Sequence, residues 1–252
     1  MAVPKGSLQK LTSEFFKKTS IEIEDYDSGS RNYRPKIGME GVEIKVLRPQ
    51  EIPILVSRGY YDIGISGLDW YRESRCENNV EDLLDLGFGK VDIVLAVPDS
   101  WSDINSPSDL FDRFNEPSHP LRIWTEYINL TEDFVFRYVN IEPTIVSPYM
   151  GLHRGRHSPI IIFHSFGATE SKPPEDGEAI IDNTETGRTL VQNNLKILHK
   201  VLPASTARLL ANRRTLLDKE KEKRIEAIRN ACEVGVPAKL TRSRVFNGHI
   251  DF

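Results

Sequence analysis

Apolar and polar residues alternate along the chain with two different periods. Between Leu8 and Thr19 the apolar residues recur at helical spacing and lysines stand near the end, so we predict an amphipathic helix. Val91–Val97 is an apolar run of the length that suits a buried strand. The same criteria predict further helices at 51–57, 132–139, 190–198 and 216–234, and further strands at 42–47, 62–67, 121–125, 144–146, 159–163, 179–181 and 205–210. Residues 80–86 fit either a helix or a strand.

The order of these elements predicts the fold class. Strands that alternate with helices indicate an α/β protein with largely parallel sheets. A polar stretch at 99–107, rich in proline and serine, is interpreted as a crossing into a second lobe. We expect lobe I at 1–97, rejoined by a return segment near 195–215, and lobe II at 98–194. The remaining residues, 216–252, are expected to form a C-terminal helix and tail, too short for a full regulatory domain.

Composition narrows the class of protein. The chain has 252 residues, 39% of them hydrophobic and 28% charged, which is typical of a globular protein. A net charge of −4 and a pI near 5.9 argue against a general nucleic-acid or membrane surface. No run is long and apolar enough to span a bilayer, and the N-terminus lacks the apolar core of a signal peptide. The two cysteines, Cys76 and Cys232, lie far apart, so we expect no disulfide framework and a cytoplasmic location.

The candidate chemistry lies in loops that follow predicted strands, where ligands of α/β sheets bind. These loops are Lys5–Ser7, Ser66–Asp69 and Asp182–Thr189. In the last loop an acidic residue precedes a Thr-Gly-x-Thr turn, whose backbone N–H groups and hydroxyls suit a phosphate, while the acid suits the hydroxyls of an attached sugar. The alternative is a structural corner, in which Asp182 caps the turn and Thr186 and Thr189 cap a helix. The motif alone leaves both interpretations open.

Several stretches, taken together and in order, resemble the ATP phosphoribosyltransferases that open histidine biosynthesis. They are Pro4–Leu8, Leu47–Val56, Tyr61–Asp69, Leu86–Gly89, Leu95–Pro98, Thr125–Thr131, Gly167–Glu170 and Asp182–Leu190. The resemblance implies a two-lobed α/β fold similar to periplasmic binding proteins of type II, with the active site in the cleft between the lobes. It also implies transfer of the phosphoribosyl group from phosphoribosyl pyrophosphate to N1 of ATP, with release of pyrophosphate, and it favours the phosphate interpretation of Asp182–Leu190.

The resemblance assigns roles to individual residues. Asp182, Arg48 and Lys5 are the expected catalytic residues, and Asp182 is expected to accept hydrogen bonds from the ribose hydroxyls. The 5-phosphate is expected at the backbone and hydroxyl groups of the phosphoribosyl loop, which comprises Asp182, Glu185, Thr186, Gly187, Arg188 and Thr189. The ATP and pyrophosphate contacts are expected from Lys5, Gly6, Arg31, Arg48, Gly67 and Asp69, with Arg34 as a weaker candidate.

Magnesium is the expected cofactor, and it is expected to bridge phosphate oxygens rather than occupy a site built from protein ligands. His153 and His157 are interpreted as solvated residues of a basic loop rather than as metal ligands. Tyr33, Trp70 and Trp124 are interpreted as packing residues.

Departures from the family pattern concern the loops and the C-terminus. Ser7 stands where many members have arginine, and Asn183 leaves one acid beside the turn where many phosphoribosyltransferases have two. Long members end in a histidine-binding domain, whereas short members need a partner that resembles histidyl-tRNA synthetase. We expect at least a homodimer, with such a regulatory subunit as a candidate partner, and no nucleic acid or membrane. The alternative function is a non-catalytic ligand-binding or regulatory relative with the same two lobes.

Overall fold

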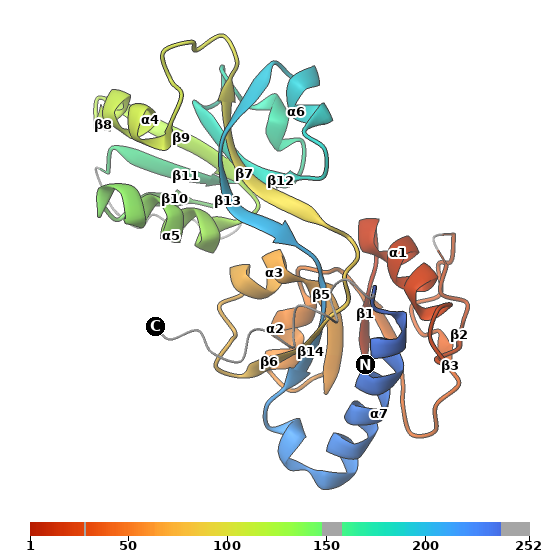
Figure 1. Cartoon of the computed structure of the whole chain (residues 1–252). Coiled ribbons are helices and arrows are strands. Elements are labelled where there is room, and N and C mark those ends of the chain that lie inside the picture. The colour runs from red at the N-terminus through yellow and green to blue at the C-terminus, as the bar shows by residue number, and fades with distance from the viewer. Residues whose placement is uncertain (28, 148–157, 238–252) are drawn as a thin grey trace. The chain divides into compact units, whose positions relative to one another are not determined.

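The computed structural model describes residues 1–27, 29–147 and 158–237, and these divide into two compact units (Figure 1). Unit 1 comprises Met1–Lys90 and the residues from Thr206 onward, and unit 2 comprises Val91–Ser205. The chain passes between the units at Lys90–Val91, whereas the sequence placed this crossing after residue 97. The strand β7 (Val91–Pro98) lies wholly in unit 2 because it pairs with β12 (Ala179–Thr184) and β13 (Leu195–Ser205).

Unit 1 is built on a five-stranded sheet with the order β4-β1-β5-β14-β6. Its strands are β1 (Ala2–Pro4), β4 (Lys45–Leu47), β5 (Ile63–Gly67), β6 (Val80–Asp85) and β14 (Ala207–Asn212). Strand β1 runs parallel to both β4 and β5, and β14 runs antiparallel to β5 and β6. The helices of this unit are α1 (Ser7–Phe16), α2 (Ile52–Ser57), α3 (Leu68–Glu73) and α7 (Lys219–Gly235), with the pair β2 (Ile23–Glu24) and β3 (Lys36–Ile37) and the 3-10 turn η2 (Thr215–Leu217).

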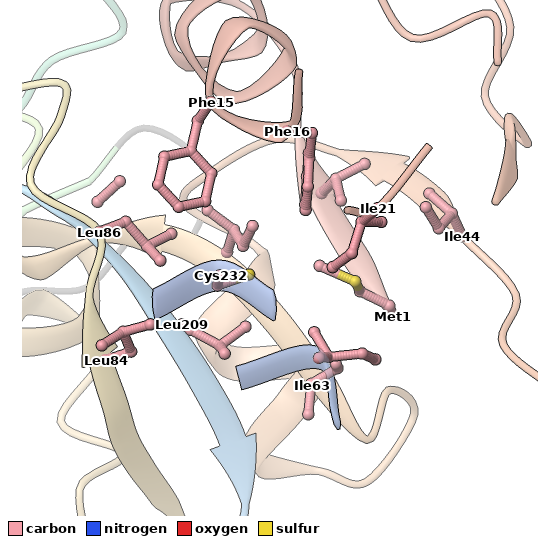
Figure 2. Packing of buried hydrophobic residues seen from close by; sticks show 14 of the residues in the cluster. Met1, Phe15, Phe16, Ile21, Ile44, Ile63, Leu84, Leu86, Leu209 and Cys232 are labelled. Carbon is pink, nitrogen blue, oxygen red and sulfur yellow. The ribbon is translucent and has the colours of Figure 1, made fainter. Parts of the chain in front are cut away.

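The C-terminal helix α7 completes the hydrophobic core of unit 1. Ile225, Ile228 and Cys232 of α7 are buried in one cluster with Phe15 and Phe16 of α1 (Figure 2). The apolar face of α1 packs against this cluster, which explains the helical periodicity of the N-terminal sequence. Helix α7 is therefore part of the body of unit 1 and not an appendage.

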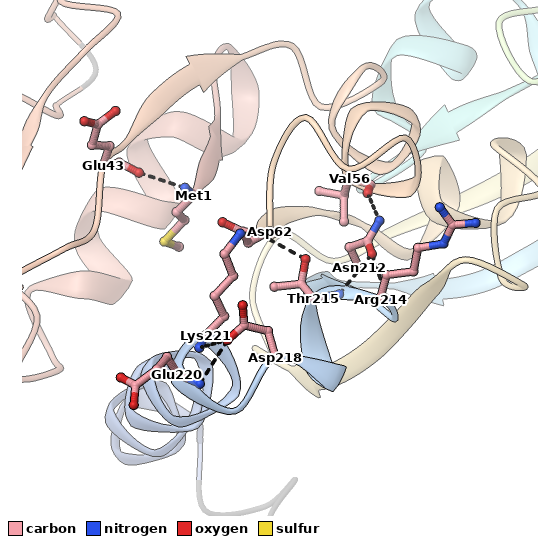
Figure 3. A network of polar contacts seen from close by, with 10 residues as sticks. All are labelled: Met1, Glu43, Val56, Asp62, Asn212, Arg214, Thr215, Asp218, Glu220 and Lys221. Atoms are coloured by element: carbon pink, nitrogen blue, oxygen red, sulfur yellow. Dashed lines mark hydrogen bonds and ion pairs between the residues drawn. The ribbon is translucent and has the colours of Figure 1, made fainter.

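Polar contacts fix the start of α7 (Figure 3). The Asp218 carboxylate caps the helix by accepting hydrogen bonds from the backbone N–H groups of Glu220 and Lys221 at 3.0 and 3.2 Å. The Lys221 ammonium lies 2.8 Å from the Asp62 carboxylate, which also accepts from the Thr215 hydroxyl at 3.1 Å. These contacts join α7 to the residue that precedes β5.

Unit 2 is built on a larger sheet with the strand order β10-β11-β9-β12-β7-β13. A further strand, β8, pairs with β9. Its remaining strands are β8 (Asn115–Glu116), β9 (His119–Thr125), β10 (Thr144–Val146) and β11 (Ile160–His164). Its helices are α4 (Pro107–Arg113), α5 (Ile128–Val139) and α6 (Arg188–Gln192), with the 3-10 turn η1 (Thr169–Ser171). Strands β10, β11, β9 and β12 are parallel, whereas β7 is antiparallel to both of its neighbours.

The predicted two-lobed α/β class is confirmed, with two local corrections. The sheets are mixed rather than largely parallel, because β7 in unit 2 and β14 in unit 1 each run antiparallel to both of their neighbours. The helix predicted at 190–198 ends at Gln192, since Asn194 takes a left-handed conformation (φ 56°) and β13 begins at Leu195.

The basic loop at 153–157 and most of the tail lie outside the described residues. Across residues 1–27, 29–147 and 158–237, no helix has the length and apolar character needed to cross a bilayer.

Candidate functional site

The carboxyl ends of three neighbouring strands bring the predicted unit 1 residues together. Because β4, β1 and β5 are adjacent and parallel, Arg48, Lys5 and Gly67 all lie at one edge of the sheet. The Lys5 backbone N–H donates to the Leu47 carbonyl oxygen at 2.7 Å, and the Ser66 hydroxyl, which is buried, donates to the Pro49 carbonyl oxygen at 2.7 Å. These bonds tie the loops after the three strands to one another.

Glycines shape this edge. Gly6 has φ +79°, and a Cβ atom added there would lie 3.7 Å from Nη1 of Arg48, so the two predicted residues are neighbours. A methyl group at Gly67 would clash with Oδ1 of Asp69, whose side chain is only 5% exposed. The close approach of this carboxylate therefore requires glycine at position 67. Asp69 lies in the first turn of α3, a position that negative charge favours, and this agrees with the structural alternative for that residue.

Positive charge gathers around Tyr33 at the same edge. The Lys5 ammonium hydrogen-bonds the Tyr33 hydroxyl and lies 3.9 Å from the centre of its ring. This hydrogen bond and the charge of Lys5 lower the pKa of the Tyr33 phenol, and the charges of Arg48 and Arg31 lower it further. Arg31 and Arg48 are thus close enough to act on the same group, whereas Arg34 does not contribute. The ring of Tyr33 is 48% exposed, so the interpretation of Tyr33 as a packing residue is wrong.

Asp182 lies at the carboxyl edge of unit 2, within β12 rather than after it. The strand continues to Thr184 because Asn183 and Thr184 still pair with Ile93 and Asp92 of β7. The Asp182 carboxylate accepts the backbone N–H of Asn183 at 2.7 Å. Asp182 therefore does not cap the following turn, as the structural alternative had required.

The surroundings of Asp182 make its carboxyl group a weaker acid than usual. The pKa of Asp182 is raised to about 6 from the usual 3.8, and burial is the main cause. The neighbouring charges of Glu126 and Glu170 contribute to this rise, while hydrogen bonds from the Asn183 N–H and the Thr169 hydroxyl oppose it. Asp182 is half-buried, and its pKa lies close to neutral pH. Carboxyl groups with such raised pKa values occur frequently at functional sites.

The turn after β12 presents backbone donors. Gly187 adopts the left-handed conformation, φ +75°, and its N–H donates to the Thr184 hydroxyl at 2.8 Å. The N–H of Arg188, the first residue of α6, donates to the Thr186 hydroxyl at 3.4 Å. The N-cap position itself is occupied by Gly187, which has no side chain to cap the helix. Within residues 158–237 and the other described ranges, the backbone N–H groups of Glu185 and Thr186, which follow the end of β12, donate to no protein acceptor. These two groups remain available for an anion.

Some residues of the site were not singled out from the sequence. Tyr127 accepts a hydrogen bond from the side-chain amide of Asn183 at 3.2 Å, and Thr169 bonds both the Ser165 hydroxyl, at 3.0 Å, and Asp182. The stretches Thr125–Thr131 and Gly167–Glu170 belong to the resemblance, but only the fold shows that Tyr127 contacts Asn183 and that Thr169 contacts Asp182.

Two other predictions concern metals and aromatic packing. No group of three or more histidine, cysteine, aspartate or glutamate side chains that could hold a metal ion occurs in the part of the chain that the structure describes. Trp124 packs in unit 2, where its ring stacks on Phe163 with centroids 4.8 Å apart and its indole N–H donates to the Asp176 carbonyl oxygen at 3.0 Å.

The chain is similar to known proteins in sequence and in fold. The HisG family, described as ATP phosphoribosyltransferase, matches residues 48–233. An ATP phosphoribosyltransferase from Desulforudis audaxviator is 36% identical over 230 residues, which cover 89% of this chain and 68% of the relative. One from Pelotomaculum thermopropionicum is 32% identical over 258 residues, covering 97% of this chain and 78% of the relative. A chain of the ATP phosphoribosyl transferase (HisG:HisZ) complex from Thermotoga maritima has a similar fold, with a TM-score of 0.65, 23% identity, and coverage of 93% of this chain and 96% of that one.

Proposed function

We infer that this chain, which belongs to the ATP phosphoribosyltransferase family, transfers the phosphoribosyl group of phosphoribosyl pyrophosphate to N1 of ATP, the first step of histidine biosynthesis. The observation that best supports this function is the arrangement of groups at the carboxyl edge of the sheet in unit 2. There a half-buried carboxylate, Asp182, immediately precedes a turn with unused backbone donors at Glu185 and Thr186. A sugar phosphate requires this combination of an acceptor for hydroxyls and donors for a phosphate.

The roles in unit 2 follow from the charge of the substrate. Displacement at C1 of the ribose develops positive charge on the sugar ring, which the Asp182 carboxylate stabilises while it accepts hydrogen bonds from the ribose hydroxyls. The N–H groups of Glu185 and Thr186 bind the 5-phosphate, and the hydroxyls of Thr186 and Thr189 add donors. Gly187 lets the backbone approach the phosphate closely, and Arg188 places a further cation beside it.

The roles in unit 1 follow from its positive charge. The leaving pyrophosphate and the triphosphate of ATP are polyanions, and they require donors that neutralise developing negative charge. Lys5, Arg31 and Arg48 supply these donors, and Gly6 and Gly67 let phosphate or base approach the backbone. Asp69 borders this position and also supports the local backbone.

Magnesium fits this arrangement as an ion that binds together with the phosphate groups of the substrates. The donor set of unit 1 is cationic and the described residues contain no cluster of metal ligands, so phosphate oxygens would provide most of the coordination. When bound, the ion neutralises part of the pyrophosphate charge. The protein groups named above bind and orient the substrates.

The assembly and location of the protein extend this proposal. We propose that the chain acts as a homodimer or higher oligomer in the cytoplasm. We also propose a regulatory partner of the HisZ type, because the similar Thermotoga maritima chain comes from a HisG:HisZ complex.

The function is tested by assaying the purified chain with ATP, phosphoribosyl pyrophosphate and magnesium, and following formation of phosphoribosyl-ATP. Turnover that Asp182→Asn abolishes and Asp112→Asn preserves supports the proposal, since Asp112 is an exposed residue of α4. Substrate binding without turnover, both alone and with a HisZ-type partner, would favour the non-catalytic alternative. Full turnover by Asp182→Asn would show that the site is assigned to the wrong residues.

A further inference from the structure

Tyr33 occupies a position that hydrophobic packing does not explain. Its carbonyl oxygen accepts the Val46 backbone N–H at 3.0 Å, so the loop is held against β4 at this residue. The preceding loop is also held by a bond from the Asn32 N–H to the Ser30 hydroxyl at 3.0 Å. The backbone is therefore fixed, yet the ring projects to the surface with 48% exposure and takes no part in the core of unit 1.

The ring and hydroxyl of Tyr33 hold the Lys5 side chain. The Lys5 backbone is fixed by its bond to the Leu47 carbonyl oxygen, and its ammonium contacts both the Tyr33 hydroxyl and the ring face, 3.9 Å from the centroid. The Lys45 ammonium lies 6.0 Å from the same centroid. A free lysine side chain populates many rotamers, and a phenol that contacts it in two ways restricts them.

The side chain that holds the Lys5 ammonium is a phenol and not a carboxylate, and this difference affects the charge of the site. Within the described residues no aspartate or glutamate forms a salt bridge with Lys5, although a carboxylate would hold an ammonium more firmly. A carboxylate would also cancel the positive charge that an incoming polyanion needs. A neutral phenol orients the ammonium without neutralising it, and Arg31 and Arg48 add to the same positive field.

We propose that Tyr33 is a positioning residue that holds the Lys5 ammonium in place for the pyrophosphate group. This role rests on the proposed function, in which Lys5 binds the leaving pyrophosphate. Tyr33 acts through Lys5 and need not touch the substrate, so its effect must disappear when Lys5 is absent.

A double-mutant cycle tests this dependence on the chain of 252 residues. Magnesium pyrophosphate is titrated calorimetrically into the unchanged protein, Tyr33→Leu, Tyr33→Phe, Lys5→Met, and the two Tyr33 variants combined with Lys5→Met. Tyr60→Leu is the matched control, because Tyr60 is 75% exposed and lies before β5, away from the carboxyl edge. Thermal unfolding of each variant is measured in parallel.

Tyr33→Leu should weaken pyrophosphate binding roughly threefold to tenfold, the effect expected when one flexible side chain is no longer pre-organised. Tyr33→Phe, which keeps the ring, should lose less. Neither change should matter in the Lys5→Met background, and Tyr60→Leu should bind normally. Because Tyr33 is exposed, the unfolding temperatures should agree across the set.

Three results would overturn the role of Tyr33. An equal loss in the presence and absence of Lys5 would show that Tyr33 acts independently, and unchanged binding would show that it does not act. Tighter binding would show that the phenol competes with pyrophosphate for Lys5. Any of these, in a protein that turns over normally, refutes the positioning role alone. If the unchanged protein neither binds pyrophosphate nor turns over, the proposed function fails and this role fails with it.

Discussion

Asp182→Asn should increase the stability of the folded protein at neutral pH while it removes transferase activity. The folded state raises the pKa of Asp182 to about 6 because the carboxylate is buried beside Glu126 and Glu170. Ionising this group in the folded protein therefore costs more than ionising it in the unfolded chain. Asparagine has nearly the same shape, keeps an oxygen that accepts the Asn183 N–H, and carries no charge.

The magnitude follows from the two pKa values. The difference between 3.8 and about 6 corresponds to an upper limit of roughly 3 kcal/mol at neutral pH. Asp182 is partly exposed, and solvent screening reduces this to about 1–2 kcal/mol. Because the folded state binds the proton more tightly, the stability of the unchanged protein falls as pH rises from about 4 to about 6. The advantage of Asp182→Asn should therefore be small near pH 4 and reach its full value above pH 6.

Urea denaturation of both proteins at a series of pH values measures this difference, with Asp112→Asn as the control for an exposed carboxylate. Phosphoribosyl-ATP formation is assayed on the same preparations. A variant that is less stable than the unchanged protein at pH 7, or a stability difference that does not change with pH, would refute the argument that burial strains this carboxylate. Retained turnover would refute its catalytic role.

Three further changes test other parts of the site and fold. Thr169→Val removes a hydrogen bond that lowers the pKa of Asp182, so the acid limb of the pH profile of kcat/KM should move to higher pH. An acid limb at the same pH in both proteins would show that it does not report the ionisation of Asp182. Gly187→Ala imposes left-handed strain of about 1 kcal/mol at φ +75° without a steric clash, and it should raise the KM for phosphoribosyl pyrophosphate more than it lowers stability, as kinetics and urea denaturation will show. Ile228→Ala removes a side chain that is 1% exposed and should cost about 2–4 kcal/mol by urea denaturation, while the folded fraction keeps its activity.

Local patterns explain why much of the fold could be predicted. The helix at Ser7–Phe16 and the strand at Val91–Pro98 have periodicities that burial requires, and each lies close to its predicted position. Helix α4 also had a signal, because Ser106 and Asp109 form a capping box with proline between them, but we predicted no element between the polar stretch at 99–107 and the strand at 121–125.

The details of the candidate site depend on distant pairing, which periodicity does not report. Strand β12 extends past Asp182 because Asn183 and Thr184 pair with β7, and this extension brings the Thr184 hydroxyl to the Gly187 N–H. Thr169 reaches Asp182 from a different loop. The turn motif was recognisable, but the groups that hold it were not.

The two units differ in the charges near their candidate residues, and we propose that this difference keeps the groups of the proposed site reactive. A displacement at the sugar carbon needs negative charge near the ribose and positive charge near the leaving pyrophosphate. A salt bridge between a functional carboxylate and a functional cation would weaken the effect of both. Instead, unit 2 surrounds Asp182 with other carboxylates, and none of the causes that shift its pKa is a cation. Unit 1 surrounds Lys5 with Arg31, Arg48 and a neutral phenol. Among the described residues, neither Asp182 nor Lys5 forms a salt bridge with a side chain of opposite charge, and the Asp182→Asn experiment measures what this costs in stability at Asp182.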